Sequence, residues 1–214
     1  MQAERRTALI YDISPSLGPD VAVWPGDTPL ARRLACDLAR GDRTTLSSLN
    51  ATSHLGAHAD APSHFDLHGR PIDEQPLHLY LGTCRVIHVS VPAGGRVMPE
   101  MLEGALGAAR VLLATGTYPD STRFNRDFAG LSPDLVDDLH RRGVRLIGID
   151  TPSVDPFDDD EHVAHHRCAA HDIAILEGLC LQDVPEGNYE LIALPLKLVG
   201  FDASPVRAVL RTLI

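Results

Sequence analysis

Short runs of apolar and β-branched residues recur along the chain, separated by polar and turn-forming residues. Runs of this kind are typical of β-strands, whose side chains alternate between the two faces of a sheet. We therefore predict strands over Thr7–Ile13, Thr44–Ala51, Arg85–Val91, Arg110–Ala114, Val144–Ile149, Ile173–Leu176, Tyr189–Leu194 and Val206–Ile214.

Helical patterns are fewer, and the clearest one covers Ser132–Arg142. Ser132 can cap the helix, Pro133 suits its first turn, and Gly143 can end it. Two further stretches carry fewer of these signals and are also predicted to be helical: Pro99–Leu106 and Glu161–Ala170. Strands combined with helices predict a mixed α/β fold. Because no linker interrupts the chain, we expect residues 1–214 to form a single domain.

Composition narrows the class of protein. The 214 residues are 44% hydrophobic and 22% charged, which is typical of a folded globular chain and excludes disorder throughout. A formal net charge of −10 disfavours non-specific nucleic-acid binding, which needs clustered cations. No apolar run approaches the roughly 20 residues of a membrane helix, and residues 1–14 lack the apolar core of a secretory signal. We therefore expect a cytoplasmic protein that binds neither nucleic acid nor membrane.

Cysteine and histidine are distributed very differently. The four cysteines show no CxxC spacing, so we expect free thiols in a reducing compartment and no thiolate zinc site. Eight of the eleven histidines, in contrast, lie in two windows, residues 54–68 and 162–171. Composition alone does not explain this clustering, so both windows are candidates for chemistry.

The first window contains four potential metal ligands whose sequence positions differ by two or four. Pro62 and Gly56 argue against a helix here, and in an extended segment such positions share one face. A polar surface turn would explain one histidine, but three histidines and an aspartate in phase favour a zinc or manganese site. The candidate ligands are His54, His58, Asp60 and His64.

The second window leaves several readings open. At helical spacing His165 and His166 point about 100° apart, so we expect only one of them to face inward. Glu177 lies in an apolar run, where a carboxylate is costly unless it is paired or bound to metal, and we leave both roles open. Trp24 precedes a Pro-Gly turn, where its ring could lie over a pocket or pack in the core.

The order of these motifs resembles that of the cyclase-like metal hydrolases. The segment His54–His64 is similar to the HxGTHxDxPxH signature of that superfamily, with Ala57 in place of the usual threonine. Alanine is common at this place in the bacterial kynurenine formamidase branch, which the remaining motifs also resemble in collinear order over nearly the whole chain. These motifs are Asp12–Ser14, Trp24–Pro29, Gly148–Pro156, Ile175–Leu179, Tyr189–Leu196 and Asp202–Arg207.

The resemblance implies a homodimer with a swivelling β/β/α-type fold and two divalent ions per chain, with zinc expected and manganese also compatible. It implies one ion held by His54, His58 and Asp60, and a second shared through Asp60 and held with His165 and Glu177. His165 is preferred over His166 because it precedes Glu177 by twelve positions, as in the branch.

The activity implied by the resemblance is arylformamidase: hydrolysis of N-formyl-L-kynurenine to L-kynurenine and formate in tryptophan degradation, by a metal-activated hydroxide. His64 matches the proton-transfer residue and Trp24 the substrate-binding aromatic residue. One alternative is another amidohydrolase of the same superfamily, such as an isatin hydrolase. A second alternative, a structural zinc module without catalysis, is disfavoured because structural zinc sites are usually closed and rich in cysteine.

Overall fold

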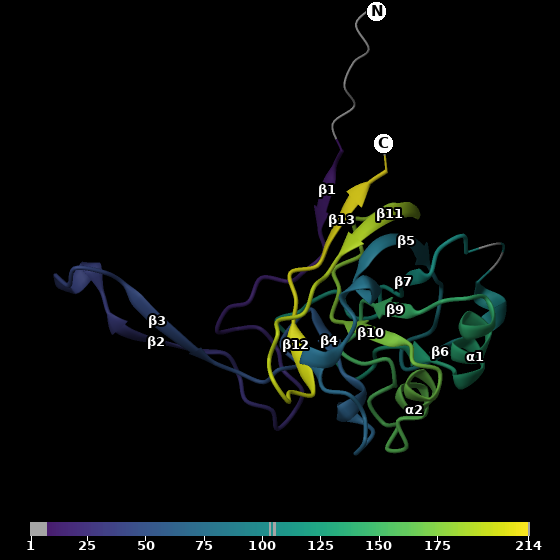
Figure 1. The fold of residues 1–214 in the computed structure, drawn as a ribbon, viewed down its shortest axis with the longest axis horizontal. Helices are drawn as coiled ribbons and strands as arrows, with labels where there is room; N and C mark the ends of the chain where they lie inside the picture. Colours follow the sequence, from purple (N-terminus) through teal and green to yellow (C-terminus); the bar gives the residue numbers. More distant parts are fainter. Residues whose placement is uncertain (1–7, 103, 105, 214) are drawn as a thin grey trace, which may run out of the picture.

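The computed structural model describes residues 8–102, 104 and 106–213, and its main feature is a curled mixed sheet of nine strands (Figure 1). The strand order is β1-β13-β11-β5-β7-β9-β10-β4-β12. Strands β5, β7, β9 and β10 pair in parallel, and the other pairs in the sheet are antiparallel. The bounds are Ile10–Asp12 (β1), His58–Asp60 (β4), Leu81–His88 (β5), Arg110–Ala114 (β7), Leu146–Ile149 (β9), Ala174–Glu177 (β10), Gly187–Ile192 (β11), Ala203–Pro205 (β12) and Val209–Thr212 (β13).

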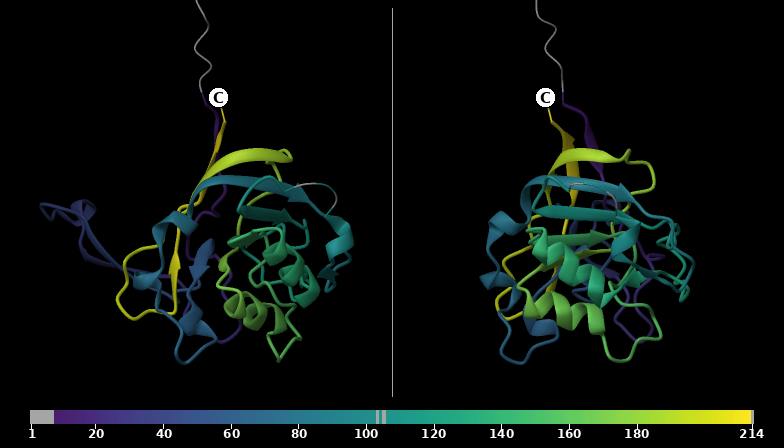
Figure 2. Two further views of the ribbon diagram at one scale, coloured as in Figure 1. Left: turned by 45° about the vertical axis from the view of Figure 1, so that its right-hand side comes forward. Right: turned by 90° about the vertical axis from the view of Figure 1, so that its right-hand side faces the viewer.

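Helices α1 (Pro133–Arg141) and α2 (Val163–Ala170) pack beside each other against the parallel strands (Figure 2). Helix α1 begins after Ser132, whose Oγ accepts a hydrogen bond from the backbone of Leu135 at 3.1 Å. Strands β7, β9 and β10 are buried on both faces, as is typical of parallel sheets. One face packs on the helices in a cluster that includes Val111, Leu113, Leu135, Leu139 and Ile147. The opposite face of these strands contributes to a second hydrophobic cluster, which includes Leu112, Leu146, Leu176 and Leu191.

Two smaller sheets and several single turns complete the described structure. Strands β6 (Arg96–Val97) and β8 (Gly130–Leu131) form a short parallel pair. Turns of 3₁₀ helix lie at Leu38–Arg40, Pro62–His64, Ile72–Glu74, Leu77–Leu79 and Pro99–Met101. No helix among the described residues is long and apolar enough to span a membrane.

The remaining sheet is a hairpin that projects from the molecule, which we call the arm (residues 31–50; Figure 1). Its strands are β2 (Ala31–Cys36) and β3 (Leu46–Asn50), which pair antiparallel with an irregularity between Leu34 and Cys36. No residue of either strand is buried. Both ends of the arm return to the body at one place, where the Thr52 backbone donates to the Thr28 carbonyl at 3.0 Å.

The structure confirms most of the elements predicted from the sequence. Each predicted strand segment overlaps an observed strand, and the helices near 132–142 and 161–170 are present. The helix predicted over Pro99–Leu106 is wrong: the chain makes only a 3₁₀ turn, and residues 103 and 105 lie outside the described residues. Glycines with positive φ at positions 104 and 107 leave the right-handed helical region, which prevents continuation. Residues 1–7 and Ile214 also lie outside the described residues. Thr7 is the first residue of one predicted strand, and Ile214 is the last residue of another.

Candidate metal centre

Pairing of strands β4 and β10 brings the two histidine windows together. His58 lies directly opposite Glu177, and Asp60 lies opposite Ile175, in the antiparallel register. Helix α2 adds His165, which is buried. The close approach depends on Gly178, at φ +64°, because a Cβ there would collide with the carbonyl oxygen of Gly56. The local chain conformation therefore lets residues far apart in sequence share one buried site.

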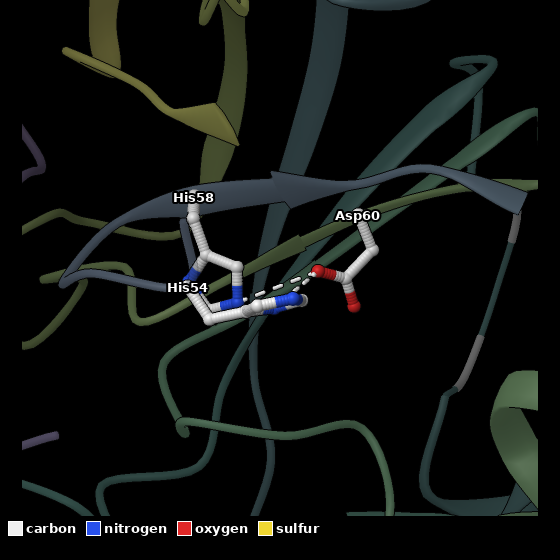
Figure 3. A group of neighbouring side chains, drawn as sticks. All are labelled: His54, His58 and Asp60. Carbon is white, nitrogen blue, oxygen red and sulfur yellow. Dashed lines mark ion pairs between the residues drawn. The ribbon is translucent and has the colours of Figure 1, made fainter. Parts of the chain in front are cut away.

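The first ligand group consists of His54, His58 and Asp60 (Figure 3). His54 Nδ1 lies 3.1 Å from Asp60 Oδ1, and His58 Nε2 lies 3.5 Å from the same oxygen. Figure 3 shows His58 and Asp60 projecting from the same side of β4, with the His54 ring between them. Two imidazole nitrogens and a carboxylate oxygen thus converge, as a divalent ion of the zinc type requires.

The second group consists of Asp60, His165 and Glu177, so Asp60 belongs to both. His165 Nε2 lies 3.5 Å from Asp60 Oδ2 and 3.2 Å from Glu177 Oε1. His58 Nε2 lies 3.2 Å from Glu177 Oε2, so the two groups are contiguous. A carboxylate whose two oxygens face different ligand groups can bridge two ions.

Hydrogen bonds behind the site orient the candidate ligands. His58 Nδ1 donates to the Gly56 carbonyl at 2.8 Å, and His165 Nδ1 donates to Asp155 Oδ2 at 2.7 Å. The carbonyl can only accept, so His58 Nδ1 must carry a proton, and its Nε2 is the nitrogen aimed at the site. Such outer hydrogen bonds fix the tautomer and the ring orientation of histidine ligands. Neither Gly56 nor Asp155 was identified in this role from the sequence.

The residues fit a bound cation. Among the described residues, no group meets hydrogen-bonding geometry with His58 Nε2 or with either oxygen of Asp60, although all three atoms are buried. Imidazole nitrogens lie near these oxygens but not in hydrogen-bonding geometry. Because unpartnered buried polar atoms are costly, a cation coordinated by them would remove the penalty.

The charges of the site also favour cation binding. Burial opposes ionisation of Asp60, yet the imidazoles of His165 and His54 hold its pKa well below the ordinary value. Burial lowers the pKa of His54, but the carboxylates of Asp60 and Asp202 outweigh it and raise this pKa to about 9. Without a metal, positive charge at this site is therefore supplied by protons on histidine.

His64 lies beside the metal ligands but belongs to a different element. The expectation of one extended segment through residues 54–64 is wrong, because the strand covers only His58–Asp60 and Pro62–His64 forms a 3₁₀ turn. The turn still directs His64 to the site, where its ring centroid lies 4.2 Å from that of His54. Its Nδ1 lies 3.3 Å from Asp202 Oδ2, an oxygen that also lies 2.9 Å from His54 Nε2. Asp202 was recognised from the sequence only as part of a motif, not as a site residue.

A cavity of about 590 Å³ opens over these residues. Trp24 lines it, with ring centroids 5.4 Å from Phe124 and 5.1 Å from Phe157. No lysine or arginine lines the cavity within the part of the chain that the structure describes. The chamber thus combines an aromatic wall with a floor of candidate metal ligands.

Comparison with known families places this site in a wider context. A family model described as "Putative cyclase" matches residues 11–156. The chain belongs to the cyclase family. The match includes Trp24, the first ligand group and Asp155, and it ends before His165 and Glu177.

Solved structures resemble this cyclase-family chain over almost its whole length. A "potential metal-dependent hydrolase with cyclase activity" is 27% identical, with a TM-score of 0.83 over 97% of this chain and 100% of that one. A predicted metal-dependent hydrolase from Bacillus stearothermophilus is also 27% identical, with a TM-score of 0.81 over 96% and 99%. Isatin hydrolase A from Labrenzia aggregata, at 22% identity, has a TM-score of 0.78 over 96% and 94% and shares the fold. The expected mixed α/β cyclase-like fold is thereby confirmed.

The two histidines of the second window have different environments in this cyclase-family chain. His165 is buried within reach of Asp60 and Glu177, whereas His166 is exposed. The geometry therefore favours His165 as the ligand of the pair, and Glu177 lies at the buried end of β10 beside it.

Proposed function

We propose that this chain is a metal-dependent hydrolase that converts N-formyl-L-kynurenine to L-kynurenine and formate. The observation that carries the proposal is the buried carboxylate of Asp60, whose oxygens lack a hydrogen bond and which is shared by two ligand groups beneath an aromatic-walled cavity. The metal-dependent hydrolases that resemble the chain over their full length support the reaction class. The motif resemblance described above supports the formamide substrate.

Two divalent ions per chain, with zinc expected, complete the proposed site. His54, His58 and Asp60 would hold one ion, and Asp60, His165 and Glu177 the other. Bound divalent ions of this type supply activated water at neutral pH and polarise a carbonyl oxygen. The mixed nitrogen and oxygen ligands suit zinc or manganese better than calcium or magnesium, which prefer oxygen alone.

The chain's own residues supply positioning and proton transfer. Water adds to the formyl carbon, the carbon–nitrogen bond breaks, and the aniline nitrogen leaves with a proton. Burial lowers the pKa of His64, so its imidazole is neutral at pH 7 and can accept a proton from water. Asp202, beside its Nδ1, orients the ring, and His64 then delivers the proton to the leaving nitrogen. Trp24 would stack on the aryl ring of the substrate.

An activity assay with metal analysis tests this proposal. Purified protein should contain close to two zinc ions per chain and should release kynurenine from N-formylkynurenine, followed by absorbance. Chelation should abolish turnover, and zinc should restore it. Ring opening of isatin without formamide hydrolysis would favour the isatin hydrolase alternative. Metal binding without turnover of either compound would favour a non-catalytic module.

We also propose that the protein is a cytoplasmic homodimer. The four cysteines are free thiols, which suits a reducing compartment. The dimer is the assembly implied by the family resemblance, and size measurement in solution tests it.

A further inference from the structure

The turn that carries Trp24 also brings a carboxylate to the cavity. The Asp27 backbone donates to the Trp24 carbonyl at 2.9 Å and closes a four-residue turn, in which Gly26 has φ +101°, a value that suits glycine. The first and last residues of such a turn lie within about 7 Å of each other at their Cα atoms. Trp24 and Asp27 both line the cavity. An aromatic ring and a carboxylate are therefore neighbours on the same wall.

Two hydrogen bonds in sequence connect Asp27 to the first ligand group. The Thr52 hydroxyl donates to Asp27 Oδ2 at 3.1 Å and accepts from the His54 backbone at 3.3 Å. The Thr52 backbone donates to the Thr28 carbonyl at 3.0 Å, so the chain next to Asp27 is tied to the same segment. The carboxylate is thereby anchored to the segment that carries a candidate metal ligand.

Asp27 differs from the other carboxylates that line the cavity. Asp150 accepts hydrogen bonds from backbone amides, Glu177 belongs to the second ligand group, and Asp202 lies beside two histidines. Asp27 is exposed, and its Oδ2 accepts from Thr52, whereas its Oδ1 accepts no hydrogen bond from any described residue. Asp27 therefore has an oxygen available to a bound cationic group.

The charges around the cavity indicate which group binds at this wall. Among the residues that the structure describes, four carboxylates line the cavity and no lysine or arginine does. A carboxylate binds an ammonium group through a charge-assisted hydrogen bond, which is stronger than a hydrogen bond between neutral groups. A ligand with an aryl ring against Trp24 and an ammonium group a few bonds away therefore fits the pair of Trp24 and Asp27.

We propose that Asp27 binds the α-ammonium group of the substrate and thereby selects aryl formamides that carry an amino-acid side chain. This inference rests on the proposed function, in which the aryl ring of N-formyl-L-kynurenine stacks on Trp24. In that compound the formamide and the amino-acid chain leave the ring at adjacent positions, so both ends of the substrate lie toward one wall. Asp27 determines specificity and takes no part in proton transfer.

Binding of L-kynurenine to the metal-loaded full chain tests this contact without depending on turnover. Kynurenine carries the ammonium group, and its desamino analogue, in which hydrogen replaces the amino group, lacks it. In titration calorimetry the wild-type protein should bind kynurenine about tenfold more tightly than the analogue, because one charge-assisted hydrogen bond separates the two ligands. Asp27→Asn should erase this preference, since the amide oxygen can still accept from the Thr52 hydroxyl but the negative charge is gone.

Asp20→Asn is the matched control. Asp20 lies in the same loop between β1 and β2, is exposed and does not line the cavity, so its variant should keep the full preference for kynurenine. A wild type that binds both ligands equally, an Asp27→Asn variant that keeps the preference, or an Asp20→Asn variant that loses it would each overturn the proposal.

Parallel kinetics distinguishes failure of this proposal from failure of the proposed function. Asp27→Asn should raise KM for N-formylkynurenine by about tenfold relative to KM for formanilide, an aryl formamide without the amino-acid chain. Kynurenine binding that depends on Asp27, without turnover of either formamide, would support the ammonium site and reject the formamidase activity. Turnover of both formamides with the same change in KM would support the activity and overturn the ammonium site.

Discussion

His64 and its neighbours differ in what each side chain can do. His58 is buried, and its Nε2 lies near the carboxylates of Asp60 and Glu177 without a hydrogen bond, whereas the His64 side chain is about one-third exposed and faces Asp202. We predict that His64→Ala keeps its metal but loses turnover by about 10²–10⁴-fold, because only proton transfer is removed. Parallel metal analysis and steady-state kinetics check this, with His58→Ala expected to lose both metal and rate. Metal depletion in His64→Ala would make His64 a ligand, and unchanged turnover would remove it from the mechanism.

Asp155 acts on the site without facing the cavity. Its carboxylate accepts hydrogen bonds from His165 Nδ1 and from the Ala164 and His165 backbones at the start of α2. Asp155→Asn should weaken zinc affinity by about 10–100-fold, because the orienting acceptor of His165 is altered. Competition with a chromogenic chelator measures the change. Asp159→Asn is the matched control: Arg96 pairs with both Asp155 and Asp159, but only Asp155 bonds to His165. Equal losses in both variants would indicate a general effect of the Arg96 ion pairs.

At the scale of elements, three loops meet at Trp24; Trp24 and Phe124 line the cavity, and Phe157 contacts the Trp24 ring. Trp24 lies between β1 and β2, Phe124 precedes β8, and Phe157 precedes α2. Trp24→Ala should lower kcat/KM for N-formylkynurenine by about tenfold, because aromatic pairing contributes about 0.5–1.5 kcal/mol beyond area burial. Metal content should be unchanged, and Trp24→Phe should retain most of the activity. If the alanine variant fails to fold or loses metal, the ring is a structural support of these loops.

The sequence was informative about elements where the signal is local. His54, His58 and Asp60 fall within one short segment, so spacing alone indicated a shared site. Asp155 and Asp202 reach the site only through tertiary contacts, which no spacing rule contains. The first strand of the arm was missed because β2 is polar and exposed and has no apolar alternation. Strands β6, β8 and β12 were missed because runs of two or three residues carry too little pattern.

At the scale of the whole molecule, site protonation links metal content to stability. Burial lowers the pKa of His54, but Asp60 and Asp202 raise it from 6.5 to about 9. The protonated form therefore stabilises the folded metal-free protein fully below pH 6.5, and this contribution is lost as the pH rises through 9. We predict that the free energy of unfolding of chelated protein falls by about 3 kcal/mol between these limits.

Urea unfolding with excess chelator at pH 6 and pH 9.5 measures this change. Metal binding should have the opposite pH dependence, because an ion competes with protons for the same nitrogens and is bound more tightly as the pH rises. Chelated protein that is equally stable at both pH values would show that His54 does not hold its proton between the two carboxylates.

The antiparallel register of β4 and β10 also determines when the site can exist during synthesis. The ribosome releases His58 and Asp60 early, but their partner strand follows after more than half of the chain's length. At 5–20 residues per second this delay is on the order of ten seconds, during which a nascent chain offers an incomplete set of ligands. In the proposed metal centre, an ion held by His54, His58 and Asp60 alone would lack the Glu177 group until that residue emerges and the strands pair. We therefore expect the proposed centre to bind its metal only after β10 has been synthesised and has paired with β4.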